Sequence, residues 1–348
     1  MEDFWRAGAG AVSVEAAALC ASSDIIDLHL DSFIWQRMGF YDLHREHGAG
    51  WLGGRYFSQA DLPRVRRSGM TGATWVITTN PARGGAGRSR AFFRNLERLS
   101  EVLEKPDGGA RLVRNAAEYT AARAEGLHAA FLGVQGGNAL DHDLADLDRL
   151  ADGRILRITL VHLTSSSLGV TSSPLRLASR TGLGPKGREY IERLGELKIF
   201  LDLAHVHPRT FDQALEVHDP SLPFLVTHTG VCGVYPHWRN LDDQQLRAVA
   251  NSGGLVGIMF HAPFLGPRGA RGPERVIDHL AHVVDTIGED HAAIGSDWDG
   301  AIVPAPALRD CGSLPLLVEA MLRRKWSPAR IEKILAGNFL RVLSEFRG

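Results

Sequence analysis

The sequence has few cysteines, no dominant charge and no long apolar run, and each absence argues against a class of protein. The three cysteines, Cys20, Cys232 and Cys311, form no C-x-x-C pair, so neither a disulfide framework nor a thiolate zinc site is expected. Lys and Arg total 39 against 40 Asp and Glu, so no overall field attracts nucleic acid. No segment reaches the roughly 18 apolar residues of a membrane helix. We therefore expect a small-molecule partner, bound at a local site.

The first 20 residues lack the pattern of an export signal. They are rich in alanine, but Glu2 and Asp3 stand where a secretory peptide has positive charge, and Glu15 interrupts the apolar stretch. We therefore expect a soluble cytoplasmic protein, with residues 1–23 as an extension ahead of the first strand.

Eight short apolar runs alternate with amphipathic segments, a pattern typical of repeated βα units in a parallel sheet. Each run is too short for a core helix and is rich in Val, Ile, Leu, Phe or Thr, which favours strand. The runs are Ile25–Leu30, Ala73–Thr78, Ala129–Val134, Ile155–Val161, Ile199–Ala204, Phe224–Thr227, Leu255–Phe260 and Ala292–Gly295. Crossover helices are expected at Arg90–Glu104, Ala116–Glu125, Arg188–Leu197, Asp242–Asn251, Pro273–Ile287 and Pro328–Leu343.

No linker or change of composition divides the 348 residues, so we expect a single domain spanning 1–348. Eight parallel strands alternating with helices over this length indicate an α/β fold of the (β/α)8 TIM-barrel type, with a doubly wound open sheet as the alternative. The polar residues favour the barrel, because they follow successive strands and would converge on one mouth. They are His29, Asp31, Gln135, His162, His205, His228, His261 and Asp297.

Four of these side chains have the chemistry of metal ligands. His29 and Asp31 are alternate residues of one strand, so an imidazole nitrogen and a carboxylate oxygen can reach the same divalent ion, such as zinc. His205 and His228 bring two further imidazoles from strand ends. Each residue alone is more typical of a structural hydrogen bond, but four in equivalent positions of one barrel favour a metal centre.

Three further residues are candidates for catalysis or binding. Asp297 is the expected acid/base or last ligand, because it lies nearer its strand than Asp299, which precedes Gly300 and could equally be a turn residue. His162 could donate to a developing oxyanion, or could be a buried histidine bonded to backbone. His261 follows the seventh run and is a candidate substrate-binding residue.

Seven segments together resemble the renal or membrane dipeptidase family, metallopeptidase family M19. The resemblance runs in order from about Asp24 to Leu343, and the set is highly specific. The segments are Asp27–Asp31, Gly133–Asn138, Asp202–Val206, Thr227–Gly230, Trp238–Asp243, Gly295–Gly300 and Gly337–Leu343. The resemblance implies a zinc-dependent (β/α)8 barrel of the amidohydrolase type that cleaves dipeptides and tolerates a D-residue at the C-terminal side.

The resemblance also implies individual roles. His162 matches the residue that polarises the scissile carbonyl, and Asp297 matches the proton-handling aspartate. Arg239 matches the arginine that holds the free carboxylate of the substrate, a role that suits a guanidinium fork with its two parallel hydrogen bonds.

One implied metal ligand is altered. By resemblance, His29 and Asp31 bind a first metal and His205 and His228 a second, but Gln135 occupies the position of the glutamate that bridges both ions. A glutamine carbonyl can ligate one cation, yet it carries no charge and bridges poorly. Two divalent ions about 3.5 Å apart would repel strongly even at an effective dielectric of about 20. We therefore expect one ion, zinc or another divalent metal, with Gln135 as a remaining ligand.

Three functions stay open because of Gln135 and of Asn138, which replaces a histidine of the family. The protein could hydrolyse an amide bond in a dipeptide or amino-acid-like substrate with one metal. It could instead be a non-hydrolytic enzyme of specialised metabolism, catalysing an elimination, isomerisation or decarboxylation. It could also be a non-catalytic binding protein. The retained Asp297, His162 and Arg239 favour an enzyme, and we prefer hydrolysis.

The stretch at 32–55 departs from the family's short polar continuation. It contains Trp35, Tyr41, His44, His47 and Trp51, so it is expected to be either a lid-like insertion that shapes substrate choice or an ordinary loop that packs aromatic residues. The outer helices of the barrel leave room for a homodimer.

Overall fold

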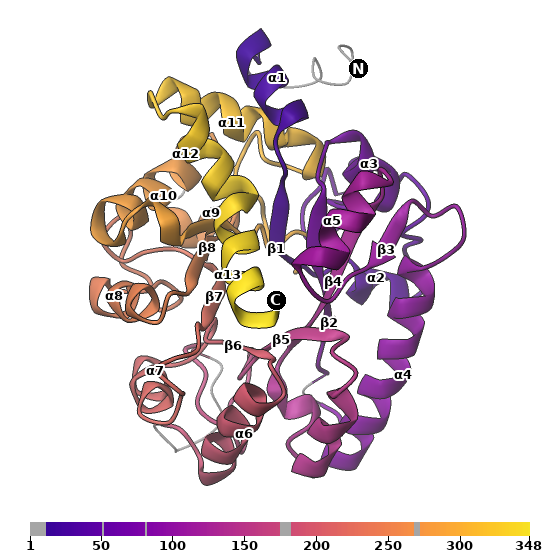
Figure 1. Ribbon diagram of the computed structural model, residues 1–348, viewed down its shortest axis with the longest axis vertical. Coiled ribbons are helices and arrows are strands. Elements are labelled where there is room, and N and C mark those ends of the chain that lie inside the picture. The colour runs from indigo at the N-terminus through magenta and orange to yellow at the C-terminus, as the bar shows by residue number, and fades with distance from the viewer. Residues whose placement is uncertain (1–11, 51, 81, 175–181, 268–271) are drawn as a thin grey trace.

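Eight parallel strands form a nearly closed barrel surrounded by helices (Figure 1). The computed structural model describes residues 12–50, 52–80, 82–174, 182–267 and 272–348. Around the barrel, the strands are β1 (Ile26–Leu30), β2 (Gly72–Thr78), β4 (His128–Gln135), β5 (Ile155–Thr159), β6 (Phe200–Asp202), β7 (Leu225–Thr229), β8 (Leu255–Ile258) and β9 (Ala292–Ile294). A short strand, β3 (Ala110–Leu112), pairs with β4 outside this path.

The expected (β/α)8 barrel is confirmed, and each of the eight predicted runs overlaps a barrel strand. The ring closes between its first strand and the segment after its last. Asp31 N–H donates to Trp298 O at 2.9 Å, and Asp297 N–H donates to His29 O at 3.2 Å. The open-sheet alternative is therefore wrong, because these bonds join β1 to the chain leaving β9.

The predicted crossover helices are all present, with ends that differ by a few residues. The helices are α1 (Val14–Ser22), α2 (Phe33–Arg37), α3 (Leu62–Arg67), α4 (Gly85–Leu103), α5 (Ala116–Ala124), α6 (Pro185–Glu196), α7 (Pro208–Leu215), α8 (Asp243–Asn251), α9 (Ala262–Leu265), α10 (Glu274–Ile287), α11 (Leu314–Arg323), α12 (Pro328–Glu332) and α13 (Asn338–Arg347). The predicted final helix is divided, because a π-helical turn at Lys333–Gly337 separates α12 from α13.

Side-chain caps explain where several helices begin. Asn115 Oδ1 accepts from Glu118 N–H at 2.9 Å at the start of α5. Asp242 and Gln245 form a reciprocal capping box at the start of α8. Each such cap typically contributes about 1 kcal/mol, since it satisfies amide groups that the first helical turn leaves unpaired.

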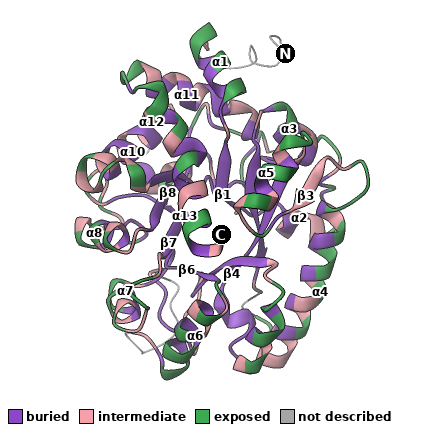
Figure 2. Cartoon of the chain, in the orientation of Figure 1, coloured by how far each residue is buried: buried purple, intermediate pink, exposed green. Residues whose placement is uncertain are grey.

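Helix α13 closes the end of the barrel opposite the polar mouth. In Figure 1 it crosses the centre of the ring of strands, and Figure 2 shows buried strands enclosed by helices whose outer faces are exposed. Asn338 Nδ2 donates to Ala292 O at 2.8 Å, at the start of β9, and Arg347 donates to Ile155 O at 2.6 Å, at the start of β5. Phe339 of α13 packs edge-on against Phe131 of β4. This plug leaves the carboxyl ends of the strands as the place for a site.

The N-terminal helix α1 packs against α11. Ala16, Leu19 and Cys20 of α1 are buried, and Ser13 N–H donates to Glu319 Oε2 at 2.9 Å. Residues 1–11 of the expected extension lie outside the described residues. Among the helices that the structure describes, none has the length and apolar character needed to cross a bilayer.

A buried histidine at the start of β4 predicts a pH dependence of stability. His128 Nδ1–H donates to Met70 O at 3.0 Å, its Nε2 accepts from Trp75 Nε1–H at 3.1 Å, and burial lowers its pKa from 6.5 to about 4. Between pH 4 and pH 6.5 the unfolded chain therefore binds more protons than the folded one. The contribution of neutral His128 to the free energy of unfolding is complete above pH 6.5 and is lost as the pH falls to 4. It amounts to about 3 kcal/mol.

We expect His128→Gln to reduce the loss of stability between pH 7 and pH 4.5 by about 2 kcal/mol, since an amide can keep both hydrogen bonds without titrating. The measurement is the free energy of unfolding in urea at the two pH values. Equal losses in the variant and the wild-type protein would contradict the assignment.

Candidate active site

The carboxyl ends of the strands bring the predicted metal ligands together. His29 and Asp31 come from the end of β1, Gln135 from the end of β4 and His228 from β7, while His205 and Asp297 follow β6 and β9. All six are buried. Ligand atoms of His29, His228 and Asp297 lie within 4.8 Å of one another. The sequence prediction of one shared mouth therefore agrees with the geometry.

Three atoms that could bind a metal ion form a triangle in this mouth: His205 Nε2, His228 Nε2 and the amide oxygen of Gln135. The Nε2 atoms of His205 and His228 are 2.8 Å apart. The Gln135 amide satisfies its neighbours when its nitrogen donates to Asp31 Oδ2 at 3.0 Å and its oxygen faces His205 Nε2 at 3.3 Å. The same amide oxygen then lies 3.4 Å from His228 Nε2. Tetrahedral zinc, with bonds of about 2.0–2.1 Å, places ligand atoms about 3.3–3.4 Å apart, so the triangle needs little adjustment.

The ring of His228 is oriented for metal binding by its neighbours. Thr227 Oγ1 donates to Asp202 Oδ2 at 2.7 Å, so the hydroxyl can only accept from His228 Nδ1–H at 3.0 Å. The proton of the neutral ring is thereby held at Nδ1, and Nε2 presents a lone pair to the mouth. This arrangement of a second group behind a histidine is typical of metal ligands.

The ring of His29 is held in the opposite tautomer. Arg157 Nη2 lies 2.7 Å from His29 Nδ1, and a guanidinium can only donate, so Nδ1 accepts. The proton of the neutral ring therefore sits on Nε2, which faces Asp31 Oδ2 at 3.2 Å and Asp297 Oδ1 at 3.8 Å. In this state His29 donates a hydrogen bond to the Asp31 carboxylate and lies beside that of Asp297.

Backbone strain marks two of the candidate residues. His205 has φ of 67° and Asp297 has φ of 64°, both in the left-handed region that non-glycine residues rarely adopt. Such conformations cost of order 1–3 kcal/mol each and cluster at functional sites.

Burial raises the pKa of Asp297 well above its usual value, and the neighbouring Asp31 raises it further, while Arg239 lowers it. These effects together favour the protonated form of the Asp297 carboxyl.

The remaining candidates lie around this centre. Arg239 is 4% exposed and donates to His228 O at 2.7 Å, and burial lowers its pKa to about 10, so it stays cationic at neutral pH. The His162 ring meets the edge of His205 at 4.6 Å between centroids, and burial lowers its pKa to about 4. His261 begins α9, and its Nδ1 accepts from Val303 N–H at 2.9 Å.

These donors fit a divalent ion. The Nε2 atoms of His205 and His228 and the amide oxygen of Gln135 converge on one point. Nitrogen and neutral oxygen ligands of this kind suit zinc and related metals. The residues could therefore hold a metal near His228.

Comparison with known proteins identifies the family. The sequence profile of the membrane dipeptidases, peptidase family M19, matches residues 14–347, almost the whole chain. The chain belongs to the M19 family. This places it among the metal-dependent, dipeptidase-like hydrolases, as the resemblance in the sequence predicted.

Individual relatives and solved structures are similar to this chain. Dipeptidase tcpJ of Claviceps purpurea is 29% identical over 258 residues, which are 74% of this chain and 60% of that protein. A metallopeptidase from Rhodobacter sphaeroides, solved with a phosphinate mimic of the dipeptide L-Ala-D-Ala, is 27% identical with a TM-score of 0.78, covering 93% of this chain and 99% of that one. The probable dipeptidase PvdM from Pseudomonas aeruginosa shares the fold, with a TM-score of 0.81 at 18% identity over 96% of this chain and 98% of that one.

Several groups that position this M19 site were not predicted from the sequence. Arg157, Asp202 and Thr227 orient the histidines, and the Thr78 hydroxyl donates to Asp31. Arg157 could have been recognised from the sequence, because it is a charged residue inside an otherwise apolar strand. The threonines could not, since threonine is common in strands.

Asp299, the second aspartate of the segment Gly295–Gly300, anchors the stretch at 32–55. Its carboxylate accepts from Gln59 N–H at 2.8 Å, from Ala60 N–H at 3.0 Å and from the Ser32 hydroxyl. Its carbonyl accepts from Trp35 Nε1–H at 2.6 Å. Trp51, one of the aromatic residues of the stretch, lies outside the described residues. Asp299 therefore ties the start of this stretch and the residues just beyond its end to the rim of the site.

We expect Asp299→Ala to lower the free energy of unfolding by about 2–4 kcal/mol, because it leaves two buried backbone amides unpaired. Urea denaturation gives the magnitude, and limited proteolysis should show cleavage near residues 32–60 first. The control is Asp42→Ala, which removes an exposed carboxylate of the same stretch and should change stability by no more than about 0.5 kcal/mol. Equal effects of the two substitutions would refute the anchoring role.

Proposed function

We propose that this M19 protein hydrolyses the amide bond of a dipeptide or a similar amino-acid derivative, using one divalent ion held by His205, His228 and the Gln135 oxygen. The observation that carries the proposal is the triangle of donor atoms, with edges of 2.8, 3.3 and 3.4 Å. Zinc is the first choice of metal because its bond lengths and preferred ligands match that triangle. When bound, such an ion polarises a carbonyl and lowers the pKa of a water molecule.

In this proposal, Asp297, His29 and His162 handle the protons and the developing charge. Asp297 takes a proton from the attacking water and delivers it to the leaving amine, a task that suits a carboxylate with a raised pKa. His29 donates to Asp31 and lies beside Asp297, so it stabilises negative charge on both carboxylates. His162 donates to the carbonyl oxygen as charge develops there.

Substrate recognition is assigned to two residues at the mouth. Arg239 holds the free carboxylate of the substrate, because it is a buried cation beside the ligand His228. His261 contacts the substrate from the start of α9. The ligand of the Rhodobacter relative, a mimic of L-Ala-D-Ala, favours an L,D-dipeptide as the first substrate to test.

A second candidate function is a non-hydrolytic reaction on the same kind of substrate. It is favoured by the pairing of Gln135 with Asp31 and of Arg157 with His29, which leaves a proton-handling cluster beside a single ion. An elimination or isomerisation needs such a cluster and no bridging hydroxide.

The number of metal ions tests the site. We expect about one equivalent of zinc per chain after equilibration and gel filtration, and close to two in Gln135→Glu, because the added charge screens two ions from each other. Gln245→Glu is the matched control, since it adds the same charge at the capping box of α8. Two equivalents in the wild-type protein would rule out the one-ion site.

Activity separates the two candidate functions. The zinc-loaded protein is incubated with L,L- and L,D-dipeptides, and free amino acids are measured. We expect the wild-type protein to hydrolyse at least one L,D-dipeptide and Arg239→Met to lower kcat/KM at least about 100-fold, since a buried charged contact is lost. If Gln135→Glu hydrolyses dipeptides and the wild-type protein does not, the non-hydrolytic function is favoured for the natural protein.

A further inference from the structure

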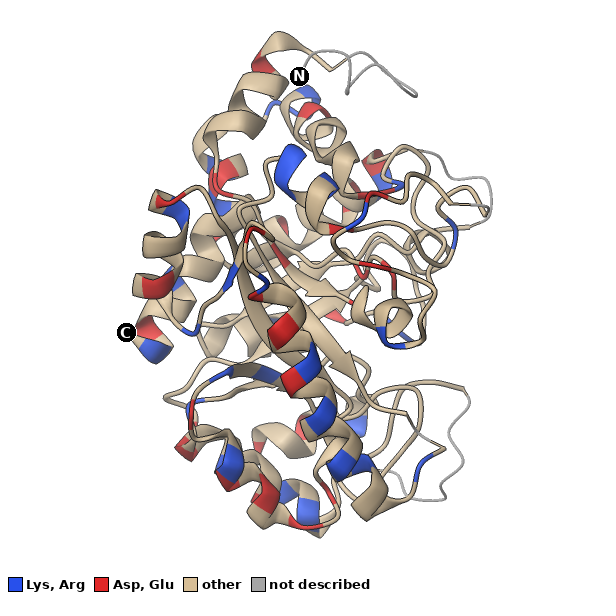
Figure 3. Ribbon diagram, turned by 90° about the vertical axis from the view of Figure 1, so that its right-hand side faces the viewer, with Lys and Arg blue, Asp and Glu red and all other residues tan. Residues whose placement is uncertain are grey.

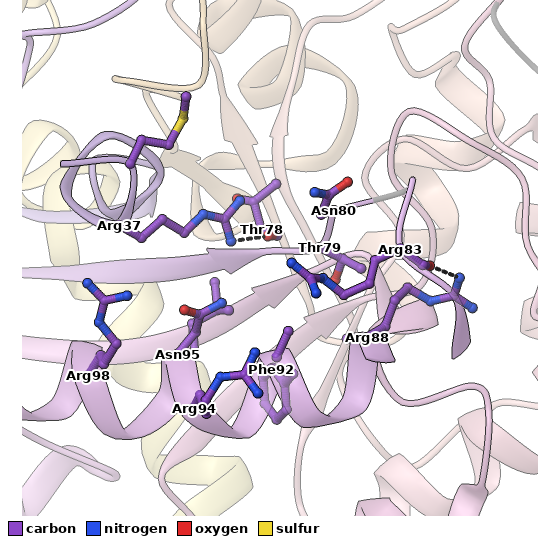
Figure 4. A pocket seen from close by; sticks show the side chains of 14 residues that line it. Arg37, Thr78, Thr79, Asn80, Arg83, Arg88, Phe92, Arg94, Asn95 and Arg98 are labelled. Carbon is purple, nitrogen blue, oxygen red and sulfur yellow. Dashed lines mark hydrogen bonds between the residues drawn. The ribbon is translucent and has the colours of Figure 1, made fainter. Parts of the chain in front are cut away.

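A second cluster of charge lies beside the barrel mouth, in a cavity of about 440 Å³ between α2, the end of β2 and α4 (Figure 4). Fourteen residues line this cavity, and within the described residues none of them is Asp or Glu. Five of them are arginines: Arg37, Arg83, Arg88, Arg94 and Arg98. His29, Gln135, His228 and Asp297 are not among the lining residues, but Thr78 is, and its hydroxyl donates to Asp31, so the cavity adjoins the candidate active site without including those residues.

Most of this positive charge has no acidic partner. Arg88 is neutralised, because its Nη2 lies 2.7 Å from Asp141 Oδ1. Arg37 donates to a carbonyl, Thr78 O, at 2.6 Å. The part of the chain that the structure describes supplies no ion pair to Arg83, Arg94 or Arg98. Basic and acidic residues are interspersed over the helices, α4 included (Figure 3), but none of the acidic residues of α4 lines the cavity.

The unpaired cations are costly to keep together. Arg94 and Arg98 lie one turn apart on α4, and like charges in that relation destabilise a helix by a few tenths of a kcal/mol. Burial lowers the pKa of Arg37, Asp31 raises it and the nearby Arg83 lowers it again. An anion in the cavity would relieve this repulsion.

The lining also limits the shape of the ligand. Arg37 comes from α2, Arg83 from the loop after β2, and Arg94 and Arg98 from α4, so guanidinium groups reach the cavity from three sides (Figure 4). A phosphate carries a charge of about −1.5 to −2 and three acceptor oxygens, which match several guanidinium groups better than a single carboxylate does. Phe92 adds an apolar wall for the organic part of the ligand.

We propose that this cavity binds a small organic phosphate at a site distinct from the candidate metal centre. Its connection to that centre is Thr78, whose carbonyl accepts from Arg37 and whose hydroxyl donates to Asp31. The proposal does not depend on the reaction catalysed at the barrel mouth.

The test is isothermal titration calorimetry of the full chain at constant ionic strength, with phenyl phosphate as the probe. We expect saturable binding that Arg98→Gln weakens at least about tenfold, as the loss of a charged hydrogen bond predicts. Arg90→Gln is the matched control, because Arg90 is also exposed on α4 but does not line the cavity. It should change the dissociation constant less than about twofold, and thermal unfolding verifies that both variants fold.

Three results would overturn the proposal. They are the absence of saturable binding, equal weakening by the two substitutions, and binding that is insensitive to Arg98→Gln, which would place the phosphate elsewhere, such as beside Arg239. Phthalate, a dicarboxylate of similar size, separates the two kinds of anion. Weaker binding of phthalate supports a phosphate site, whereas binding at least as tight as that of phenyl phosphate would contradict it.

Discussion

The buried ion pair between Arg157 and Asp202 is the interaction on which the rest of the site depends. Arg157 Nη1 lies 3.0 Å from Asp202 Oδ2, and both side chains are at most 1% exposed. Arg157 also donates to Leu28 O and reaches His29 Nδ1, while Asp202 accepts from Thr159 and Thr227. One pair thus joins β1, β5, β6 and β7 below the mouth. Loss of one partner from such a pair typically costs 3–5 kcal/mol, because the other charge remains buried and unpaired.

This pair also divides the mouth into two chemical halves. On the Asp202 side, Thr227 holds the His228 proton at Nδ1 and directs the Nε2 lone pair toward His205 and Gln135. On the Arg157 side, His29 is held as a donor toward Asp31 and Asp297. The Gln135 amide lies between the halves, since its oxygen faces the imidazoles and its nitrogen faces Asp31. A bridging carboxylate could not donate to Asp31, so glutamine suits a one-ion site next to a cluster of carboxylates.

The sequence was sufficient to predict the positions of the site but not the orientations within it. Eight apolar runs predict eight strands because buried parallel strands need continuous apolar sequence, and the barrel then places every strand end at one mouth. Hydrogen-bond direction is set by side chains far apart in the chain, such as Arg157 and His29, so no local pattern records it. The sequence did not lead us to predict the strand β3 or the helices α1, α2, α3, α7, α9 and α11. The shortest of them, such as the three-residue β3 and the four-residue α9, carry too few periodic positions to be distinguished from loops.

The altered ligand set does not by itself indicate a site that has lost its function. The mouth keeps a buried cation in Arg239, a carboxyl in Asp297 whose pKa is raised by burial, and left-handed backbone at His205 and Asp297. Each of these features opposes folding, and apolar residues of similar size would relieve the first two. The barrel does not need them for support, because α13 and the apolar strands supply the core independently of the mouth. A cluster that costs stability and serves no structural purpose is best explained by chemistry at the mouth.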